Sequence, residues 1–130
     1  MIIGIGTDII EIKRIEEAIK KNSRFIKKCF TEKERILFKE KKNKIQTIAA
    51  TFAAKEAVAK ALGTGFRNFE FYDIEILRDK KGKPLVFLYR NAKEILKKFK
   101  RPQVLVSISH CKDYAIAYAV IEGEEIHESM

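Results

Sequence analysis

Four residues have side chains suited to metal and phosphate chemistry: Asp8, Glu56, Lys60 and His110. Asp8 interrupts the otherwise apolar residues 1–10, where a bare carboxylate would be costly, so it must cap a helix, pair with a cation or bind a metal. Two carboxylates and a lysine suit a site for Mg²⁺ and phosphate. Magnesium takes one or two carboxylates together with substrate phosphates and water, and an ammonium group neutralises the phosphates.

Glu56 and Lys60 belong to residues 45–62, in which alanine and apolar residues cover nearly the whole helical circumference. This pattern predicts the central buried helix of the fold. At about 100° per residue, Glu56 and Lys60 share one sector with small residues such as Ala53 and Ala59. A structural i,i+4 ion pair is the simpler interpretation, but it suits an exposed helix better than an alanine-lined sector.

Glycines lie within the segment that carries Asp8 and directly after the helix that carries Glu56 and Lys60. Gly63, Thr64 and Gly65 follow the predicted helix, with Gly63 in the position where a left-handed residue commonly ends a helix. The backbone N–H groups of this loop could hold an anion beside Lys60. Two glycines within residues 1–10 predict a buried strand whose backbone is approached closely by another element.

The remaining pattern predicts an α+β fold in which an antiparallel sheet packs around the long buried helix. Expected helices are an amphipathic one over residues 11–21, a capped one from Thr31 to about Lys41, and one opened by Asn91, with Phe99 inward, that stops before Pro102. Expected hairpins join residues 71–77 to 85–89 and residues 103–109 to 114–121, and an acidic, frayed tail follows from Glu122.

The chain has 130 residues, 46% of them hydrophobic, which fits one compact domain over residues 1–130. Its 27 Lys and Arg against 18 Asp and Glu give a net charge of +9. Such a charge is expected of proteins that meet nucleic acid, acidic lipids, acidic proteins or phosphorylated metabolites.

Membrane insertion and secretion are not expected. The longest apolar run, residues 114–121, is well short of the roughly 20 residues that cross a bilayer. Cys29 and Cys111 lie far apart with no metal-ligand spacing, so neither a disulfide framework nor a structural zinc site is indicated. A reducing cytoplasm fits best.

Three motifs together resemble the holo-acyl-carrier-protein synthases, which are short, single-domain 4′-phosphopantetheinyl transferases. They are GIGTDI at residues 4–9, FAAKEA with KALGTG across residues 52–65, and SISH at residues 107–110. The resemblance implies transfer of the 4′-phosphopantetheine arm of coenzyme A to a serine of an apo acyl carrier protein. The reaction supports fatty acid biosynthesis, requires Mg²⁺ and releases adenosine 3′,5′-bisphosphate.

The resemblance also implies roles for individual residues. Asp8 and Glu56 would hold the metal against the coenzyme A pyrophosphate, and Lys60 would contact the phosphates. Residues 63–65, Ser109 and His110 would line the nucleotide pocket. The serine proton could go to Glu56, to Asp8 or to a metal-bound water.

In that family the active site lies between the subunits of a trimer, and basic residues of the first helix dock the carrier protein. Arg14, Lys21 and Arg24 occupy this region here, and the acidic carrier would be attracted by the +9 charge. One position departs from the family, since Thr51 stands where an arginine is usual. Lys44 is a candidate to replace that arginine.

Three other interpretations compete with this one, and the second of them is discarded. A nucleic-acid-binding module would use aromatic residues such as Phe66, Phe69 and Tyr72 near Arg67, but leaves the carboxylates without a purpose. A dinucleotide fingerprint would need a third glycine where Ile9 stands. A noncatalytic carrier-protein-binding subunit would not need the carboxylate pair.

Overall fold

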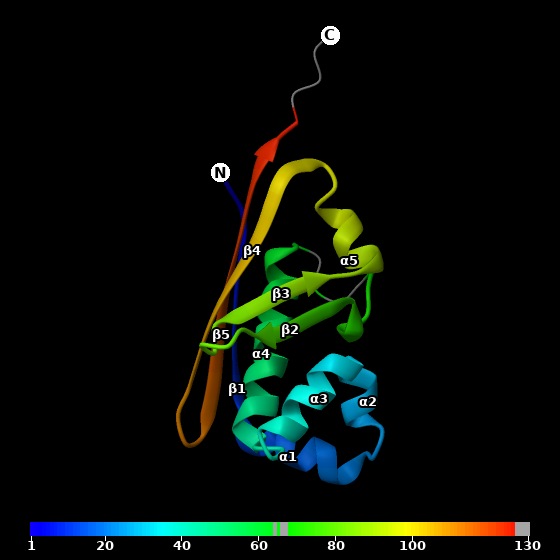
Figure 1. The fold of residues 1–130 in the computed structure, drawn as a ribbon, viewed down its shortest axis with the longest axis vertical. Coiled ribbons are helices and arrows are strands. Elements are labelled where there is room, and N and C mark those ends of the chain that lie inside the picture. The colour runs from blue at the N-terminus through cyan, green and yellow to red at the C-terminus, as the bar shows by residue number, and fades with distance from the viewer. Residues whose placement is uncertain (64, 66–67, 127–130) are drawn as a thin grey trace.

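The computed structural model describes residues 1–63, 65 and 68–126. A three-stranded antiparallel sheet of order β1-β5-β4 forms one layer, and helices with a two-stranded sheet, β2-β3, form the other (Figure 1). The predicted α+β class is confirmed. The elements in chain order are β1 (Ile2–Glu11), α1 (Ile12–Lys21), α2 (Phe25–Cys29), α3 (Glu32–Glu40), α4 (Ile45–Ala61), η2 (Phe71–Asp73), β2 (Ile74–Arg78), β3 (Pro84–Leu88), α5 (Arg90–Ile95), β4 (Phe99–His110) and β5 (Tyr114–Glu125).

The long helix α4 packs across the three-stranded sheet, as the sequence predicts. Its alanines form much of the core, and Ala115, Ala117 and Ala119 of β5 are buried beneath it. Glycine makes the closest approach possible. A Cβ atom added at Gly4 or Gly6 of β1 would overlap backbone carbonyl oxygens of α4, so α4 is the element whose approach the two glycines indicate.

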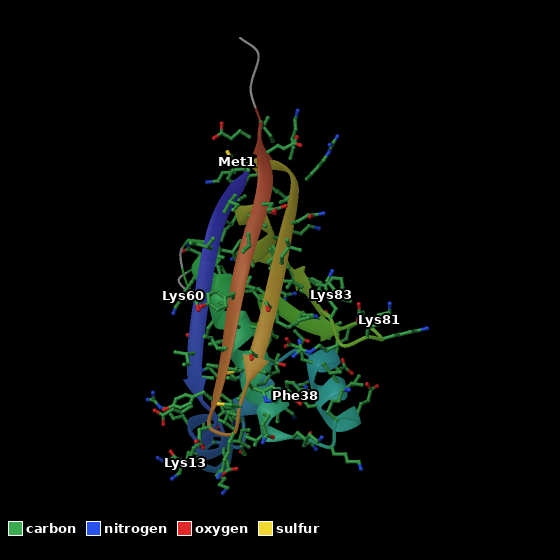
Figure 2. The ribbon with its side chains drawn as sticks, turned by 90° about the vertical axis from the view of Figure 1, so that its left-hand side faces the viewer. Met1, Lys13, Phe38, Lys60, Lys81 and Lys83 are labelled. Atoms are coloured by element: carbon green, nitrogen blue, oxygen red, sulfur yellow. The ribbon has the colours of Figure 1, made fainter. Side chains whose placement is uncertain are left out.

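The prediction that residues 1–10 form a buried strand is correct for the strand and wrong for the burial. Alternate side chains of β1 face away from α4, and Ile5 and Ile9 remain 71% and 63% exposed. Figure 2 looks onto this side of the sheet, which none of the described helices covers. The sheet therefore presents an apolar outer face.

Helices α1 to α3 cluster at one end of α4 (Figure 1). The predicted amphipathic helix is confirmed, since Ile12 and Ile15 of α1 are buried and its charged positions are exposed. The capping box of α3 is also confirmed. The Glu34 N–H donates to Thr31 Oγ1 (3.2 Å), and the Thr31 N–H donates to Glu34 Oε1 (2.8 Å). None of the described helices is long and apolar enough to traverse a bilayer.

Both predicted hairpins form, but the structure corrects three boundaries. Residues 71–73 form the 3₁₀ turn η2 rather than a strand, because the side chain of Asp73 accepts the Glu70 N–H and closes the turn. Asn91 does not cap α5; its amide instead donates to the Asn68 carbonyl (3.0 Å). The helix begins at Arg90.

The third correction concerns the ends of β4 and β5. Phe99, expected inside a helix, starts β4 and pairs with Glu125. The acidic tail, expected to be frayed from Glu122, is therefore part of strand β5 as far as Glu125. Lys100 lies opposite Glu124, whose charge complements the basic start of β4. Pro102, expected to stop a helix, falls within β4 where the pairing register shifts.

Candidate functional site

Asp8, Glu56 and Lys60 meet at the β1 edge of the sheet. Asp8 has the same strand parity as Gly4 and Gly6, so it points toward α4. The Lys60 ammonium donates to the Thr7 carbonyl (3.0 Å) and lies 3.4 Å from Asp8 Oδ1. Figure 2 shows Lys60 beside β1, on the side away from β4.

The two carboxyl groups are electrostatically coupled. Burial raises the pKa of Asp8, and Lys60 opposes part of this shift. The pKa of Glu56 is raised by burial first and by the negative charge of Asp8 second, again partly offset by Lys60. The site therefore holds more negative charge than one ammonium neutralises. A cation is the partner that would stabilise both carboxylates.

Two carboxylates suit Mg²⁺ better than a metal ion that takes all its ligands from the protein. Among the described residues, no cluster of three or more His, Cys, Asp or Glu side chains is placed to hold a metal ion. Magnesium needs fewer protein ligands, since it commonly takes one or two carboxylates and completes its shell with phosphate and water. Asp8 and Glu56 meet that requirement.

The loop after α4 is described only in part. Gly63 has a φ of +90°, as expected for a residue that ends a helix. Its N–H donates to the Lys60 carbonyl (2.9 Å), so this group closes the helix rather than facing an anion. Gly65 also has a positive φ, of +58°. Thr64 lies outside the described residues, as do Phe66 and Arg67.

His110 and Ser109 lie on the opposite edge of the sheet from Asp8. Asp8 pairs with Ala117 of β5, and Ala117 pairs with Ile108 of β4, so two strand spacings separate the two groups. Both residues are exposed, and as neighbours on one strand they point to opposite faces. One chain does not bring His110 to the carboxylates.

His110 lines a basic cleft of about 750 Å³. Lys41, Lys44 and Lys112 line it together with Thr47. Thr51, where the sequence lacks an expected arginine, is fully buried and donates its hydroxyl to the Thr47 carbonyl (2.9 Å). Thr51 therefore contributes no charge to the cleft, whereas Lys44 lines it.

The basic residues at the first helix are all available to a partner. Arg14 lies on the exposed side of α1, opposite the buried Ile12 and Ile15. Lys21 ends the helix, and Arg24 follows it; both are exposed. The three side chains share one end of the molecule with α2 and α3.

A buried ion pair next to the candidate site was not predicted from the sequence. The Lys55 ammonium donates to Glu34 Oε1 (2.6 Å) and to the Cys29 carbonyl (2.7 Å), and both side chains of the pair are fully buried. Glu34 Oε2 accepts the Ile76 N–H (2.8 Å). The available signal was the position of Lys55 on a helix that is apolar all round, where a lysine must be buried and paired.

Two of the aromatic residues that suggested nucleic-acid binding have structural roles. Phe69 is 5% exposed and belongs to the hydrophobic core. Tyr72 lies under the Arg90 guanidinium, 5.4 Å from its ring centre, and Arg90 is also paired with Asp73. Neither ring is presented as a free stacking platform.

Comparisons with known proteins agree with the geometry. A family model of the 4′-phosphopantetheinyl transferase superfamily matches residues 4–119. The holo-acyl-carrier-protein synthase of Clostridium tetani is 56% identical over 124 residues, which cover 95% of this chain and 98% of that protein. The enzyme of the same name from Alkaliphilus oremlandii is 56% identical over 120 residues, 92% of this chain and 98% of that protein.

Solved structures agree as well. The crystal structure of holo-acyl-carrier-protein synthase from Neisseria meningitidis superposes with a TM-score of 0.83 at 38% identity, covering 94% of this chain and 99% of that chain. The Bacillus anthracis synthase, crystallised in complex with CoA (3′,5′-ADP), gives a TM-score of 0.78 at 38% identity, covering 96% and 99%.

Proposed function

The chain belongs to the holo-acyl-carrier-protein synthases of the 4′-phosphopantetheinyl transferase superfamily, and we propose how its own residues carry out the reaction. The enzyme transfers the 4′-phosphopantetheine arm of coenzyme A to a serine hydroxyl of apo acyl carrier protein. It releases adenosine 3′,5′-bisphosphate and so supplies the holo carrier protein used in fatty acid biosynthesis.

The observation that carries the proposal is the coupled pair Asp8 and Glu56 with Lys60 beside it. Burial first and the negative charge of Asp8 second raise the pKa of Glu56, and burial raises the pKa of Asp8. Both carboxylates are therefore matched to a divalent cation, and they would hold Mg²⁺ from two different elements. When bound, Mg²⁺ neutralises and orients the pyrophosphate of coenzyme A.

The chain's own groups then position the reaction. Lys60 is held by the Thr7 carbonyl and Asp8, which leaves its ammonium at the site to contact a phosphate oxygen. Attack on phosphorus depends mainly on alignment and charge neutralisation. The proton acceptor for the serine hydroxyl stays open among Glu56, Asp8 and a water molecule at the metal, because a bound cation would lower the basicity of both carboxylates.

The nucleotide half of the site comes from a second subunit. Ser109 and His110 lie on the sheet edge opposite Asp8, so a coenzyme A molecule that contacts both groups bridges neighbouring chains. The outer sheet face supports an assembly because it is apolar and uncovered (Figure 2). Its exposed hydrophobic side chains are Ile5, Ile9, Leu105, Tyr114 and Tyr118.

We take the assembly to be a homotrimer, and subunit mixing tests the shared site. Asp8→Asn and His110→Ala chains should each be inactive alone. In a mixed assembly, some sites should combine an intact Asp8 from one chain with an intact His110 from its neighbour. Random mixing restores about a quarter of the sites. A mixture that stays inactive after subunit exchange, or a monomer with full activity in sedimentation, contradicts the shared site.

Carrier-protein docking is assigned to Arg14, Lys21 and Arg24. All three are exposed at α1 and just beyond it, and the chain carries a net charge of +9. An acidic partner is attracted to such a surface over a distance of about 10 Å at moderate salt. The basic end therefore serves encounter and orientation rather than chemistry.

Two further assignments, of the domain and of the cellular compartment, accompany the reaction. Residues 1–130 form one 4′-phosphopantetheinyl transferase domain, supported by the family match over residues 4–119 and by one hydrophobic core cluster among the described residues. The enzyme works in the cytoplasm, which agrees with Cys29 and Cys111 both being free thiols.

Calorimetry of coenzyme A binding tests the metal assignment directly. Wild-type protein should bind coenzyme A more tightly with Mg²⁺ than with a chelator, and Asp8→Asn should lose this difference. Glu17→Gln, which changes an exposed carboxylate on α1, is the matched control and should keep it. Equal affinity with and without Mg²⁺ in the wild type would refute the metal site.

A further inference from the structure

A small cavity of about 350 Å³ lies where the β2-β3 hairpin approaches β4 and the ends of α3 and α4. It is distinct from the carboxylate site, because it opens at the β4 edge of the sheet. Cationic and polar residues line it from β2, β4, α4 and the end of α3: Arg78, Ser107, His110, Thr47 and Lys41.

Arg78 is the unusual member of this group. Its Nη1 atom is buried and is the only buried side-chain nitrogen or oxygen among the described residues without a hydrogen-bond partner. The carboxylate of the neighbouring Asp79 does not supply a hydrogen-bond acceptor for this atom. Asp79 Oδ1 instead accepts the N–H groups of Lys81 (2.8 Å) and Lys83 (2.9 Å), which closes the hairpin turn.

A buried guanidinium nitrogen without an acceptor is costly, because its N–H groups lose water and gain nothing in return. The rest of the half-buried Arg78 side chain lines the cavity. Burial lowers the pKa of Arg78, but an arginine remains charged at neutral pH. With Lys41 and His110 lining the same cavity, the missing partner is an anion. Phosphate suits it, since guanidinium groups bind phosphate oxygens in paired hydrogen bonds.

Coenzyme A carries phosphate in two places, its pyrophosphate and the 3′-phosphate of its ribose. The pyrophosphate is already assigned to Asp8, Glu56 and Lys60 at the opposite edge of the sheet. On the basis of the proposed function, we propose that Arg78 binds the 3′-phosphate of coenzyme A and makes the enzyme select this donor over 3′-dephospho-coenzyme A. Arg78 thus belongs to the His110 half of the shared site.

A two-donor kinetic comparison tests this assignment. Arg78→Gln should lower kcat/KM for coenzyme A by about 10- to 100-fold, the value of a charged hydrogen bond. The same variant should change kcat/KM for 3′-dephospho-coenzyme A by less than about twofold. Lys81→Gln is the matched control on the same hairpin, because its side chain extends away from the molecule (Figure 2), and it should behave as wild type with both donors.

The outcomes separate a specific role from a structural one. Equal losses with both donors would mean that Arg78 supports the fold, and no loss with coenzyme A would mean that it does not touch the phosphate; either result overturns the assignment. Lys41→Gln removes an exposed cation from the same cavity. If Arg78→Gln does not fold, Lys41→Gln must show the donor-selective loss, and an equal loss refutes the subsite.

Failure of the proposed function would look different. In that case the wild-type protein would transfer phosphopantetheine from neither donor. Binding of adenosine 3′,5′-bisphosphate and of adenosine 5′-monophosphate, measured by calorimetry, is independent of transfer. Wild-type protein should bind the bisphosphate at least tenfold more tightly, Arg78→Gln should remove this preference, and an unchanged preference would contradict the role of Arg78.

Discussion

Asp8 and Glu56 occupy a site whose burial disfavours the charged form of both carboxyl groups. In the absence of a cation, the raised pKa of each group means that ionising it above its ordinary pKa costs folding free energy. A structural ion pair would instead lower the pKa of its carboxyl group and stabilise the fold. A free-energy cost of this kind is expected of a metal site that has not bound its metal.

Neutral isosteres of the carboxylates should separate activity from stability. Asp8→Asn and Glu56→Gln should each lower transfer more than about 100-fold, since loss of a ligand exceeds the 10- to 100-fold cost of losing its supporting hydrogen bonds. Each should also leave Tm unchanged or higher, because like-charge repulsion is relieved.

Thermal unfolding and transfer assays with and without Mg²⁺ check this prediction. Mg²⁺ should raise the Tm of the wild type and not that of either variant. A fall in Tm of several degrees for Asp8→Asn, with Mg²⁺ stabilisation retained, would show that the carboxylate serves the fold rather than the metal.

Individual site residues were predictable to different degrees. Asp8, Glu56 and Lys60 stand out because charged residues in apolar segments need partners, and the helical period places the last two together. Lys55 and Arg78 are equally important to the structure, but their types are common along this lysine-rich chain. Only their burial against other elements distinguishes them, and burial of a single long side chain depends on tertiary packing.

Among the elements, α4 determines the geometry of the site. It carries Glu56 and Lys60, and it lies directly on β1 because Gly4 and Gly6 have no side chains. The distance between Asp8 and Glu56 is therefore set by backbone contact between the two elements. The position of α4 on β1 therefore also sets where the two carboxylates lie relative to each other.

Adding a methyl group at this contact should disturb both. In Gly6→Ala, the new Cβ would meet the Ala57 carbonyl and the Ala61 nitrogen, which are backbone atoms, so α4 must move. We expect a loss of about 1–3 kcal/mol in unfolding free energy together with weaker Mg²⁺-dependent binding of coenzyme A. Urea unfolding and calorimetry measure these effects.

Gly123→Ala provides the matched control. Its added Cβ would meet the side chains of Ile3 and Phe99 at 3.2 Å, away from the carboxylates. It should cost stability without changing the Mg²⁺ dependence. If Gly6→Ala and Gly123→Ala affect metal dependence equally, the close contact does not set the site.

The buried pair of Lys55 with Glu34 ties α4 to α3 and β2. Lys55→Met would leave the Glu34 carboxylate buried without its cation, and should cost about 3–5 kcal/mol in urea unfolding. The double variant Lys55→Met with Glu34→Gln should recover more than half of that loss, since no uncompensated charge remains. A single-variant cost under about 1 kcal/mol would show that the pair is not needed.

Element types followed well from periodicity, and element ends did not. The helices α1, α3 and α4 and both hairpins are set by local spacing of apolar residues. The paired tail and the first residues of β4 depend on each other, since Phe99 and Glu125 are far apart in sequence. Such long-range pairing leaves no local signal, and the basic and acidic runs looked like solvated ends.

At the scale of the whole molecule, charge and apolar surface are separated. The basic residues of α1 face solvent at one end, and the hydrophobic side chains of the outer sheet face lie along β1, β5 and β4. The first surface suits an acidic partner that must leave after each turnover. The second suits a permanent contact between subunits.

A charge reversal on α1 should weaken docking without touching chemistry. Arg14→Glu should raise the KM for carrier protein by about tenfold at low salt, leave the KM for coenzyme A nearly unchanged, and lose much of its effect at high salt because screening weakens both attraction and repulsion. Lys80→Glu makes the same charge change at the hairpin tip and should have little effect. Equal losses toward both substrates at all salt concentrations would place Arg14 in the catalytic site or the fold.

Mass spectrometry of the carrier protein tests the central claim most directly. Apo acyl carrier protein incubated with the wild-type enzyme, coenzyme A and Mg²⁺ should gain the mass of one phosphopantetheine on its serine, with release of adenosine 3′,5′-bisphosphate. The gain should disappear with a chelator or with Asp8→Asn, while Glu17→Gln should retain it. An unmodified carrier protein with the wild-type enzyme, or full modification by Asp8→Asn, would contradict the account.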